Sequence, residues 1–201
     1  MIAIVDTGGA NLTSVVNALG RLGVAGSIDE LLTSDPLKIK SASHVFLPGV
    51  GAAGDAMARL EKSKLGDCLR GLKQPVLGIC LGMQILFDRS DEGAVDCLKI
   101  MPGRVSRIQA VPGLSVPHMG WNRIRIEKQA KCPLLEGIPD ESFFYFIHSF
   151  VAPPGKHVVA TSRHGGRFPA VVQKDNVFGV QFHPERSSEA GAALLRNFLE
   201  L

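Results

Sequence analysis

The chain has 201 residues, of which 45% are hydrophobic, and its 22 basic and 19 acidic side chains leave a formal charge of +3. These values predict one compact domain, residues 1–201, and the absence of a basic run gives no reason to expect nucleic acid as a partner. The longest apolar run, residues 76–87, is shorter than the roughly 20 residues of a membrane span and is interrupted by Gln84. Four cysteines without a C-x-x-C pair, and a start that leads directly into a strand pattern, predict a cytoplasmic protein with reduced thiols.

The first half of the chain alternates strand-like and helix-like patterns. A β-rich run and a Gly-rich turn are followed by apolar residues at helical spacing from Leu12 to Leu22. A long helical face, with Gly66 as its expected break, precedes the strand that ends in Cys80. Strands alternating with helices favour a parallel sheet. The strands predicted in this half are residues 2–5, 24–28 (weakly), 45–47 and 76–80, and the long helical face is residues 53–72.

The second half is predicted to be largely β. Its strand-like segments are separated by turn signals instead of helices, and residues 174–176 are expected to join the last two as a hairpin. An amphipathic helix closes the chain from Ala190 to Leu201, with Ser187 or Ser188 as its N-cap. The expected fold is therefore α/β, a mostly parallel central sheet flanked by helices with a β-rich second half. The strands predicted here are residues 104–108, 123–126, 143–147, 158–161, 170–173 and 177–182.

Cys80 lies at the corner between an apolar strand and a helix-like pattern, with Gly78 and Gly82 on either side. A sharp strand-to-helix turn needs small neighbours, because bulky residues two positions away would collide. The N–H groups at the start of the helix would favour the thiolate, and the amide of Leu81 could donate to a developing oxyanion. Since an isolated cysteine is more often a packing residue, a catalytic role requires a base elsewhere in the chain.

His183 is the histidine with an organised neighbourhood, at the end of an apolar strand and followed by Pro184 and Glu185. In extended backbone, residues two apart share a face, so Glu185 is expected to orient the imidazole while the ring accepts the proton of Cys80. The predicted catalytic residues are therefore Cys80, His183 and Glu185. No spacing indicates a metal site, and no cofactor is expected. Of the other histidines, solvated side chains are expected at His44, His157 and His164, and structural ones at His118 and His148.

Residues 49–54 match the G-x-G-x-x-G pattern of dinucleotide-binding proteins. That fold requires an acidic residue about 20 positions later, at the end of the next strand. Here the next strand ends in Cys80. We therefore interpret residues 48–51 as backbone beside the cysteine, where Val50 or Gly51 supplies a second N–H donor to the oxyanion.

Two distant motifs, residues 78–84 and 181–185, together resemble the class I (triad) glutamine amidotransferases. The resemblance implies a flavodoxin-like α/β domain that hydrolyses L-glutamine to glutamate and ammonia through a cysteine thioester. Cys80, His183 and Glu185 fall on the triad positions of that family.

Within this family, residues 6–12, 48–51, 117–122 and 145–150 are similar to segments of the glutaminase subunits of imidazole glycerol phosphate synthase, of histidine biosynthesis. The implied partner is the cyclase subunit, a (β/α)8 barrel that receives the ammonia. The implied glutamine-binding residues are Gln84, Glu92, Ser149 and Phe150, the last two through backbone, and the implied partner-facing residues are Asn11, Met119, Trp121, Tyr145 and Arg186.

The residues themselves leave alternatives open. Trp121, in a Pro-rich loop, fits an interface and a core about equally, and solvated side chains would explain Gln84 and Glu92. Four positions depart from the usual form of the family. Thr7 and Phe150 stand where tyrosine is usual, Ala53 stands where an aromatic residue is usual, and Arg186 stands where lysine is usual. None of these departures affects the predicted triad.

Three rival functions remain at this stage. Another amidotransferase subunit, of anthranilate, GMP or carbamoyl phosphate synthesis, would share the triad but lack the 117–122 segment. A stand-alone cysteine hydrolase would be fully active without a partner, and a binding module would carry an unreactive Cys80. For the amidotransferase, we expect the backbone of residues 48–51 to be misaligned in the free subunit and corrected by the partner.

Overall fold

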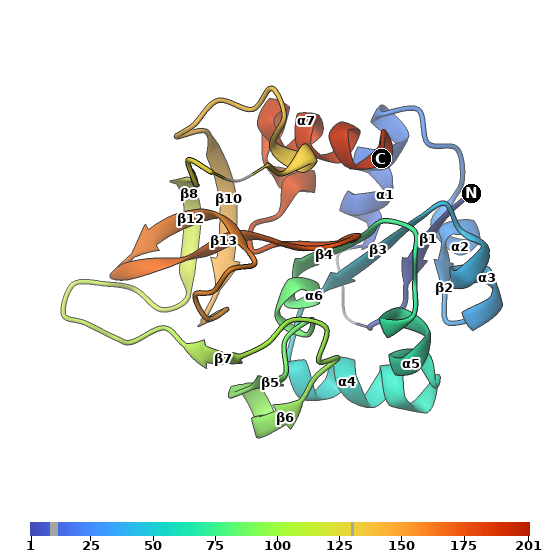
Figure 1. The fold of residues 1–201 in the computed structure, drawn as a ribbon, viewed down its shortest axis with the longest axis horizontal. Helices are drawn as coiled ribbons and strands as arrows, with labels where there is room; N and C mark the ends of the chain where they lie inside the picture. Colours follow the sequence, from blue (N-terminus) through green and yellow to red (C-terminus); the bar gives the residue numbers. More distant parts are fainter. Residues whose placement is uncertain (9–11, 130) are drawn as a thin grey trace.

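The computed structural model describes residues 1–8, 12–129 and 131–201, and its main feature is a twisted eight-stranded sheet (Figure 1). The first five strands in the order across the sheet are parallel to one another, and the remaining three pair antiparallel. This confirms the predicted α/β class with a mostly parallel sheet. The order is β2 (Leu32–Thr33), β1 (Ile2–Val5), β3 (His44–Gly49), β4 (Val76–Cys80), β14 (Val177–Val180), β13 (Gly166–Lys174), β12 (Val158–His164) and β9 (Arg125–Ile126).

Helices cover both faces of the parallel strands (Figure 1). On one face lie α1 (Leu12–Arg21) and α7 (Ser188–Leu199), and on the other lie α4 (Ala53–Lys62) and α5 (Leu65–Arg70). Successive side chains of β3 point to opposite faces of the sheet and so belong to different core layers. Phe46 packs toward α1 and α7, while Val45 and Leu47 pack toward α4 and α5. The shorter helices α2 (Ile28–Leu31) and α3 (Pro36–Ser41) lie near the N-terminal strands.

Two smaller sheets complete the β-rich second half. One is the antiparallel pair β8 (His118–Arg123) and β10 (Phe143–His148). The other has the order β11 (Phe150–Val151), β7 (Arg104–Arg107), β5 (Arg89–Ser90) and β6 (Val95–Asp96). Single 3-10 turns occur at η1 (Glu92–Ala94), η2 (Pro133–Leu135) and η3 (Pro184–Arg186). Within the described ranges, none of the helices is long and apolar enough to cross a membrane.

Two predictions in the first half are wrong. The weak strand at residues 24–28 is absent, because the Ser27 N–H donates to the Glu30 carboxylate at 2.7 Å and this capping box starts α2. The second strand is β2 instead. The long helical face breaks at Lys64, whose φ of 54° lies in the left-handed region, and Gly66 lies inside α5.

The elements around the predicted motifs also differ from expectation in part. The helix after Cys80, α6 (Leu81–Gln84), has a single turn, since Leu86 and Phe87 donate to Met83 and Gln84 in 3-10 fashion before the chain enters β5. The segment expected to be a Pro-rich loop contributes most of its length to β8. The strands expected at 2–5, 45–47, 76–80 and 143–147 are confirmed, as are the hairpin at residues 174–176 and the N-cap position of Ser187.

Candidate active site

Cys80 is the last residue of β4 and has the backbone angles φ 55° and ψ −110°. This conformation is unfavourable for a residue with a Cβ and costs of the order of 1–3 kcal/mol. A Cβ on Gly82 would overlap the carbonyl oxygen of Leu47, and a Cβ on Gly78 would lie 2.7 Å from the carbonyl oxygen of Gly82. Both glycines are thus sterically required, and the predicted sharp turn is confirmed.

Strand pairing brings His183 to the same edge of the sheet as Cys80. β14 runs parallel to β4 with Val180 opposite Ile79, so the residues that follow both strands emerge side by side. Cys80 and His183 line one cavity. Nδ1 of His183 lies 2.8 Å from Oε1 of Glu185, and both side chains are buried. The carboxylate reaches the ring from the η3 turn, so the expected extended backbone after His183 is wrong although the contact forms.

The imidazole of His183 is poised to carry a positive charge. Burial by itself lowers the pKa of this ring, but the Cys80 sulfur and the Glu185 carboxylate outweigh it and raise the pKa well above the usual value. Nε2 is buried and has no hydrogen-bond partner of ordinary geometry among the described residues, which leaves it available to the Cys80 thiol and to a substrate. A raised imidazole pKa beside a thiol favours the thiolate and imidazolium pair.

Ser187 fixes the backbone that carries His183. Its hydroxyl donates to the carbonyl of His183 at 2.6 Å and accepts from the N–H of Tyr145 at 3.0 Å. The N–H of His183 in turn donates to the carbonyl of Tyr145 at 2.9 Å. Ser187 occupies the predicted N-cap position of α7, but its side chain makes these contacts instead of a cap hydrogen bond. The sequence pattern gave no sign of this link between β10 and His183.

A cavity of about 390 Å³ surrounds the cysteine and collects the predicted oxyanion and glutamine-binding positions. A larger hollow of about 1450 Å³ along β9, β12 and β13 has no cysteine or histidine in its described lining, so its size does not indicate the reaction site. The predicted residues that line the smaller cavity are Val50, Gly51, Cys80, Leu81, Gln84, Glu92, Ser149, Phe150, His183, Glu185 and Arg186.

Gln84 is buried, so the alternative of a solvated side chain is wrong for it. Its amide nitrogen donates to the carbonyl of Phe150 at 2.9 Å and to Oε1 of Gln181 at 3.0 Å. Both hydrogens are thereby used, and the amide oxygen is the atom left to accept a hydrogen bond from a ligand. Gln181 places its own Nε2 3.9 Å from the Cys80 sulfur. No role was expected for Gln181. Its position could have indicated one, because it is a polar residue within an apolar segment, two positions before His183.

The turn at residues 48–51 is held from both sides. The Thr7 hydroxyl donates to the carbonyl of Pro48 at 2.6 Å. On the other side, Oε2 of Glu92 accepts from the N–H of Ala53, the first residue of α4, at 2.9 Å. Gly51, between these anchors, has a φ of 92° that favours glycine. Sequence reasoning missed Thr7, because its contact depends on the pairing of β1 with β3.

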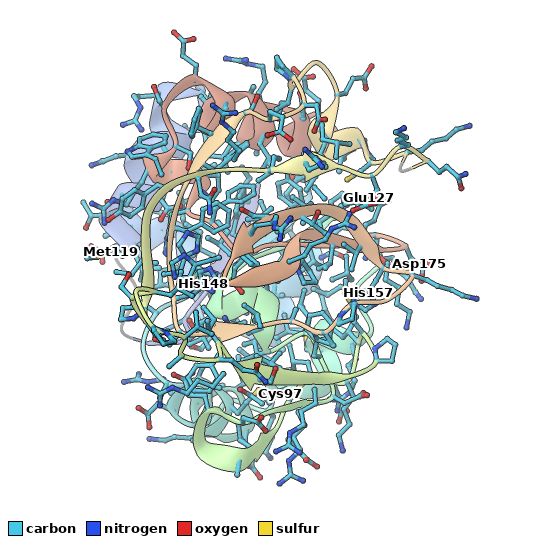
Figure 2. The ribbon with its side chains drawn as sticks, turned by 90° about the vertical axis from the view of Figure 1, so that its left-hand side faces the viewer. Cys97, Met119, Glu127, His148, His157 and Asp175 are labelled. Atoms are coloured by element: carbon cyan, nitrogen blue, oxygen red, sulfur yellow. The ribbon has the colours of Figure 1, made fainter. Side chains whose placement is uncertain are left out.

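Two of the residues expected to face a partner are exposed on β8. Met119 is 62% and Trp121 is 53% exposed, which rules out the core interpretation of Trp121, and Figure 2 shows Met119 at the outer edge of the molecule. The Tyr145 ring contacts Trp121 edge-on at 6.1 Å between centroids, and the Arg186 guanidinium lies 4.8 Å from the Tyr145 centroid. These four side chains form what we call the aromatic face. Asn11 lies outside the described residues.

The remaining histidines differ partly from expectation. His157 is buried against Phe87 and hydrogen-bonds to the Pro153 carbonyl, so the solvated side chain expected there is wrong. His118 and His148 are buried and hydrogen-bonded to each other. Among the described side chains, no group of three or more His, Cys, Asp or Glu residues could hold a metal ion.

The cysteines differ in their surroundings, which predicts selective alkylation. Burial raises the pKa of Cys97 and that of Cys132 to about 11, so both remain thiols at neutral pH. Cys80 adjoins the imidazole of His183, which favours the reactive thiolate. Limited iodoacetamide treatment near pH 7 should therefore modify Cys80 first, as measured by peptide mass spectrometry. Equal modification of Cys80 and the half-buried Cys132 would contradict this prediction.

Comparisons with known proteins agree with this geometry. The profile of the family described as "Glutamine amidotransferase class-I" matches residues 3–201. "Imidazole glycerol phosphate synthase subunit HisH" of Xylella fastidiosa (strain 9a5c) is 49% identical over 200 residues, covering 100% of this chain and 97% of that protein. The protein of the same name from Haemophilus influenzae (strain ATCC 51907 / DSM 11121 / KW20 / Rd) is 49% identical over 199 residues, covering 99% and 96%. A crystal structure of a glutamine amidotransferase superposes with a TM-score of 0.73 at 20% identity, covering 99% of this chain and 97% of that one, which supports the fold. The chain belongs to the class I glutamine amidotransferase family.

Proposed function

We propose that this chain is the glutaminase subunit of an imidazole glycerol phosphate synthase. It hydrolyses L-glutamine to glutamate and ammonia and supplies the ammonia to the cyclase subunit in histidine biosynthesis. The observation that carries this proposal is the full-length identity of 49% to HisH subunits, together with a cysteine, a histidine and a glutamate around one cavity. The whole chain, residues 1–201, would act as one glutamine amidotransferase domain in the cytoplasm.

The first chemical step is the attack of the Cys80 thiolate on the carboxamide carbon of glutamine. The carbonyl oxygen becomes an oxyanion as the carbon–sulfur bond forms. The amide of Leu81, directly after the nucleophile, would donate to this oxygen, together with the amide of Val50 or Gly51 across the cavity. All of these residues line the cavity.

His183 moves the protons of both half-reactions. As imidazolium, it gives a proton to the departing nitrogen when the tetrahedral intermediate collapses to the thioester and ammonia. The neutral ring then takes a proton from a water molecule, whose oxygen attacks the thioester carbon. The carbon–sulfur bond breaks, Cys80 leaves as the thiolate and glutamate is released. Glu185, hydrogen-bonded to Nδ1 at 2.8 Å, keeps Nε2 directed toward the reacting atoms and stabilises the imidazolium. These steps use only side chains and backbone amides of this chain.

The amino-acid end of glutamine would lie between Gln84, Glu92 and the backbone of Ser149 and Phe150. The free amide oxygen of Gln84 and the Glu92 carboxylate can accept hydrogen bonds from an ammonium group. Ser149 and Phe150 line the same cavity, and the carbonyl of Phe150 accepts from Gln84. Because these acceptors would bind a cationic amino group, an amide that carries one, such as glutamine, suits this site better than a simple amide.

The aromatic face is the proposed docking surface for the cyclase subunit, a (β/α)8 barrel. Tryptophan, tyrosine, methionine and arginine are enriched in protein interfaces. Arg186 belongs to this face and also lines the cavity, so a partner docked here would lie at the rim of the site. Ammonia released beneath a docked partner would avoid bulk water, where protonation would end its nucleophilicity. Asn11 is proposed to join this surface.

The partner is also proposed to align the oxyanion donors of residues 48–51. Gly51, at a φ of 92°, gives the turn a backbone freedom that other residues lack, so a peptide rotation here is accessible. The complex should therefore hydrolyse glutamine at least about tenfold faster than the isolated chain, since misplacing one oxyanion donor costs about 10²–10³ in kcat. The measurement is glutamate release with and without the cyclase subunit.

The same assay separates the rival functions. Equal rates with and without the cyclase subunit would contradict activation and favour a stand-alone cysteine hydrolase. A Cys80 that does not react with a glutamine-like electrophile in the complex would favour a binding module. Failure to co-purify with the cyclase subunit, combined with activation by another synthase, would favour a different amidotransferase subunit.

A further inference from the structure

The catalytic steps leave two buried histidines unused. His118 on β8 and His148 on β10 face each other in strand register, and only 4% and 6% of their surfaces are exposed. Nδ1 of His118 lies 2.9 Å from Nε2 of His148. The rings are packed against Phe146 and Phe168, and the His164 ring is stacked on His118. Apolar packing around polar atoms makes an unpaired hydrogen-bonding group costly here.

The hydrogen bonds fix the tautomer of each ring. The carbonyl oxygen of Phe150 can only accept, so Nδ1 of His148, 2.9 Å away, must donate to it. Nε2 of His148 is then an acceptor, and Nδ1 of His118 must be the donor between the two rings. Nε2 of His118 is left to accept from the Asn122 amide at 3.1 Å. Each nitrogen of the pair has one possible role.

Asn122 cannot reverse this pattern, because both ends of its amide are held. Its oxygen accepts from the N–H of Arg123 at 2.8 Å, and its nitrogen also donates to the carbonyl of Arg163 at 2.9 Å. A proton added to either ring would place two N–H groups opposite each other. Burial accordingly lowers the pKa of His118 to about 4 and that of His148 to about 3. Both rings are therefore neutral at physiological pH.

The Phe150 carbonyl is the point where this pair meets the glutamine site. It accepts from His148 and also from Gln84, both at 2.9 Å. Gln84 donates on to Gln181, whose amide lies 3.9 Å from the Cys80 sulfur. A continuous series of polar groups thus runs from β8, the strand that carries Met119 and Trp121, to the nucleophile. In Figure 2, Met119 lies at the outer edge of the molecule and His148, a member of this series, lies farther inside.

We propose that His118 and His148 are positioning residues for glutamine binding. Through the Phe150 carbonyl they hold the backbone of one wall of the cavity and the Gln84 amide in one orientation. The amide oxygen of Gln84 consequently stays directed to the amino group of the substrate. His148 is itself part of the cavity lining, whereas His118 is not, so the effect of His118 falls on glutamine binding more than on the chemical step. This inference rests on the proposed function for the identity of the substrate.

A matched pair of variants at His118 tests the proposal in the complex with the cyclase subunit. Phenylalanine fits the aromatic surroundings but cannot donate to His148, whereas the amide nitrogen of asparagine can take the place of Nδ1. His118→Phe should raise KM for glutamine about fivefold to tenfold with kcat within about twofold, and His118→Asn should restore KM. A KM within about twofold of wild type in folded His118→Phe would overturn the proposal. A loss confined to kcat would overturn it too.

Nuclear magnetic resonance of the ¹⁵N-labelled wild-type chain provides a readout that needs no turnover. Both rings should carry their proton on Nδ1 and remain neutral from about pH 5.5 to 8, with assignment by His118→Asn and His148→Asn. A ring that titrates in this range, or that is protonated on Nε2, would overturn the proposed network. Because this result does not depend on glutamine, a wild-type complex that fails to hydrolyse glutamine would refute the proposed function separately.

Discussion

Replacing Cys80 by serine is expected to reduce glutamine hydrolysis by the complex at least about a thousandfold. The geometry of the turn would be kept, because serine is smaller than cysteine and accepts the same backbone. The hydroxyl, however, is far less acidic than the thiol and would not ionise beside His183. Glutamate release measures the loss directly. The cyclase reaction supplied with ammonium salt should continue, which would show that the partner and the docking surface are intact.

Cys132→Ser is the matched control for this experiment. Cys132 is a half-buried free cysteine that does not line the cavity, and its raised pKa keeps it protonated. Its replacement should leave hydrolysis within about twofold of wild type, as is usual for substitutions away from a site. An undiminished rate in Cys80→Ser would remove the sulfur from the mechanism and with it the proposed thioester.

Replacing His183 by asparagine is expected to have an effect of similar size, at least about a thousandfold on glutamine hydrolysis. The asparagine amide can still hydrogen-bond to Glu185, which favours a folded variant, but the nitrogen that handles protons is gone. The alkylation of Cys80 should change as well. In wild type the raised pKa of His183 keeps a positively charged imidazolium beside the sulfur, and that charge is lost in the variant.

In the His183→Asn variant, alkylation near pH 7 should slow and should recover as the pH rises toward about 8.5, the ordinary pKa of a free thiol. The rate of iodoacetamide modification against pH is the measurement. His157→Gln is the control, since His157 is buried outside the cavity and its hydrogen bond to Pro153 can be replaced by an amide. Normal turnover, or an unchanged alkylation profile, in His183→Asn would exclude this histidine as the base.

The predictions that succeeded rest on short-range chemistry. Gly78 and Gly82 mark the turn at Cys80 because any Cβ there would collide with backbone. The continuous apolar runs of β3 and β4 reflect helices on both faces of the sheet. His183, Pro184 and Glu185 are adjacent in sequence, so their contact required no knowledge of the distant chain. Such local signals were enough to predict the α/β class and the sharp turn at Cys80.

The features that were missed depend on contacts between distant segments or on very short elements. Strands of two residues, such as β2 and β11, contain too few positions to show a period. The capping box at Ser27 overrode the β-propensity of residues 24–28. The contacts of Thr7, Gln181 and His118 follow only from which strands pair, and no pattern along the chain contains that information. The sequence likewise does not indicate that Trp121 is exposed, because the surface proposed to cover it belongs to a separate chain.

The pairing of β4 with β14 has a consequence for the synthesis of the protein. Cys80, the proposed nucleophile, is made early, but His183, the proposed base, follows about a hundred residues later, just after a strand that must insert beside β4. Until the last quarter of the chain has been made, the nascent polypeptide carries Cys80 without His183. If His183 is the base, unfinished chains would not release ammonia, because the order of the strands delays the pairing of the base with the cysteine.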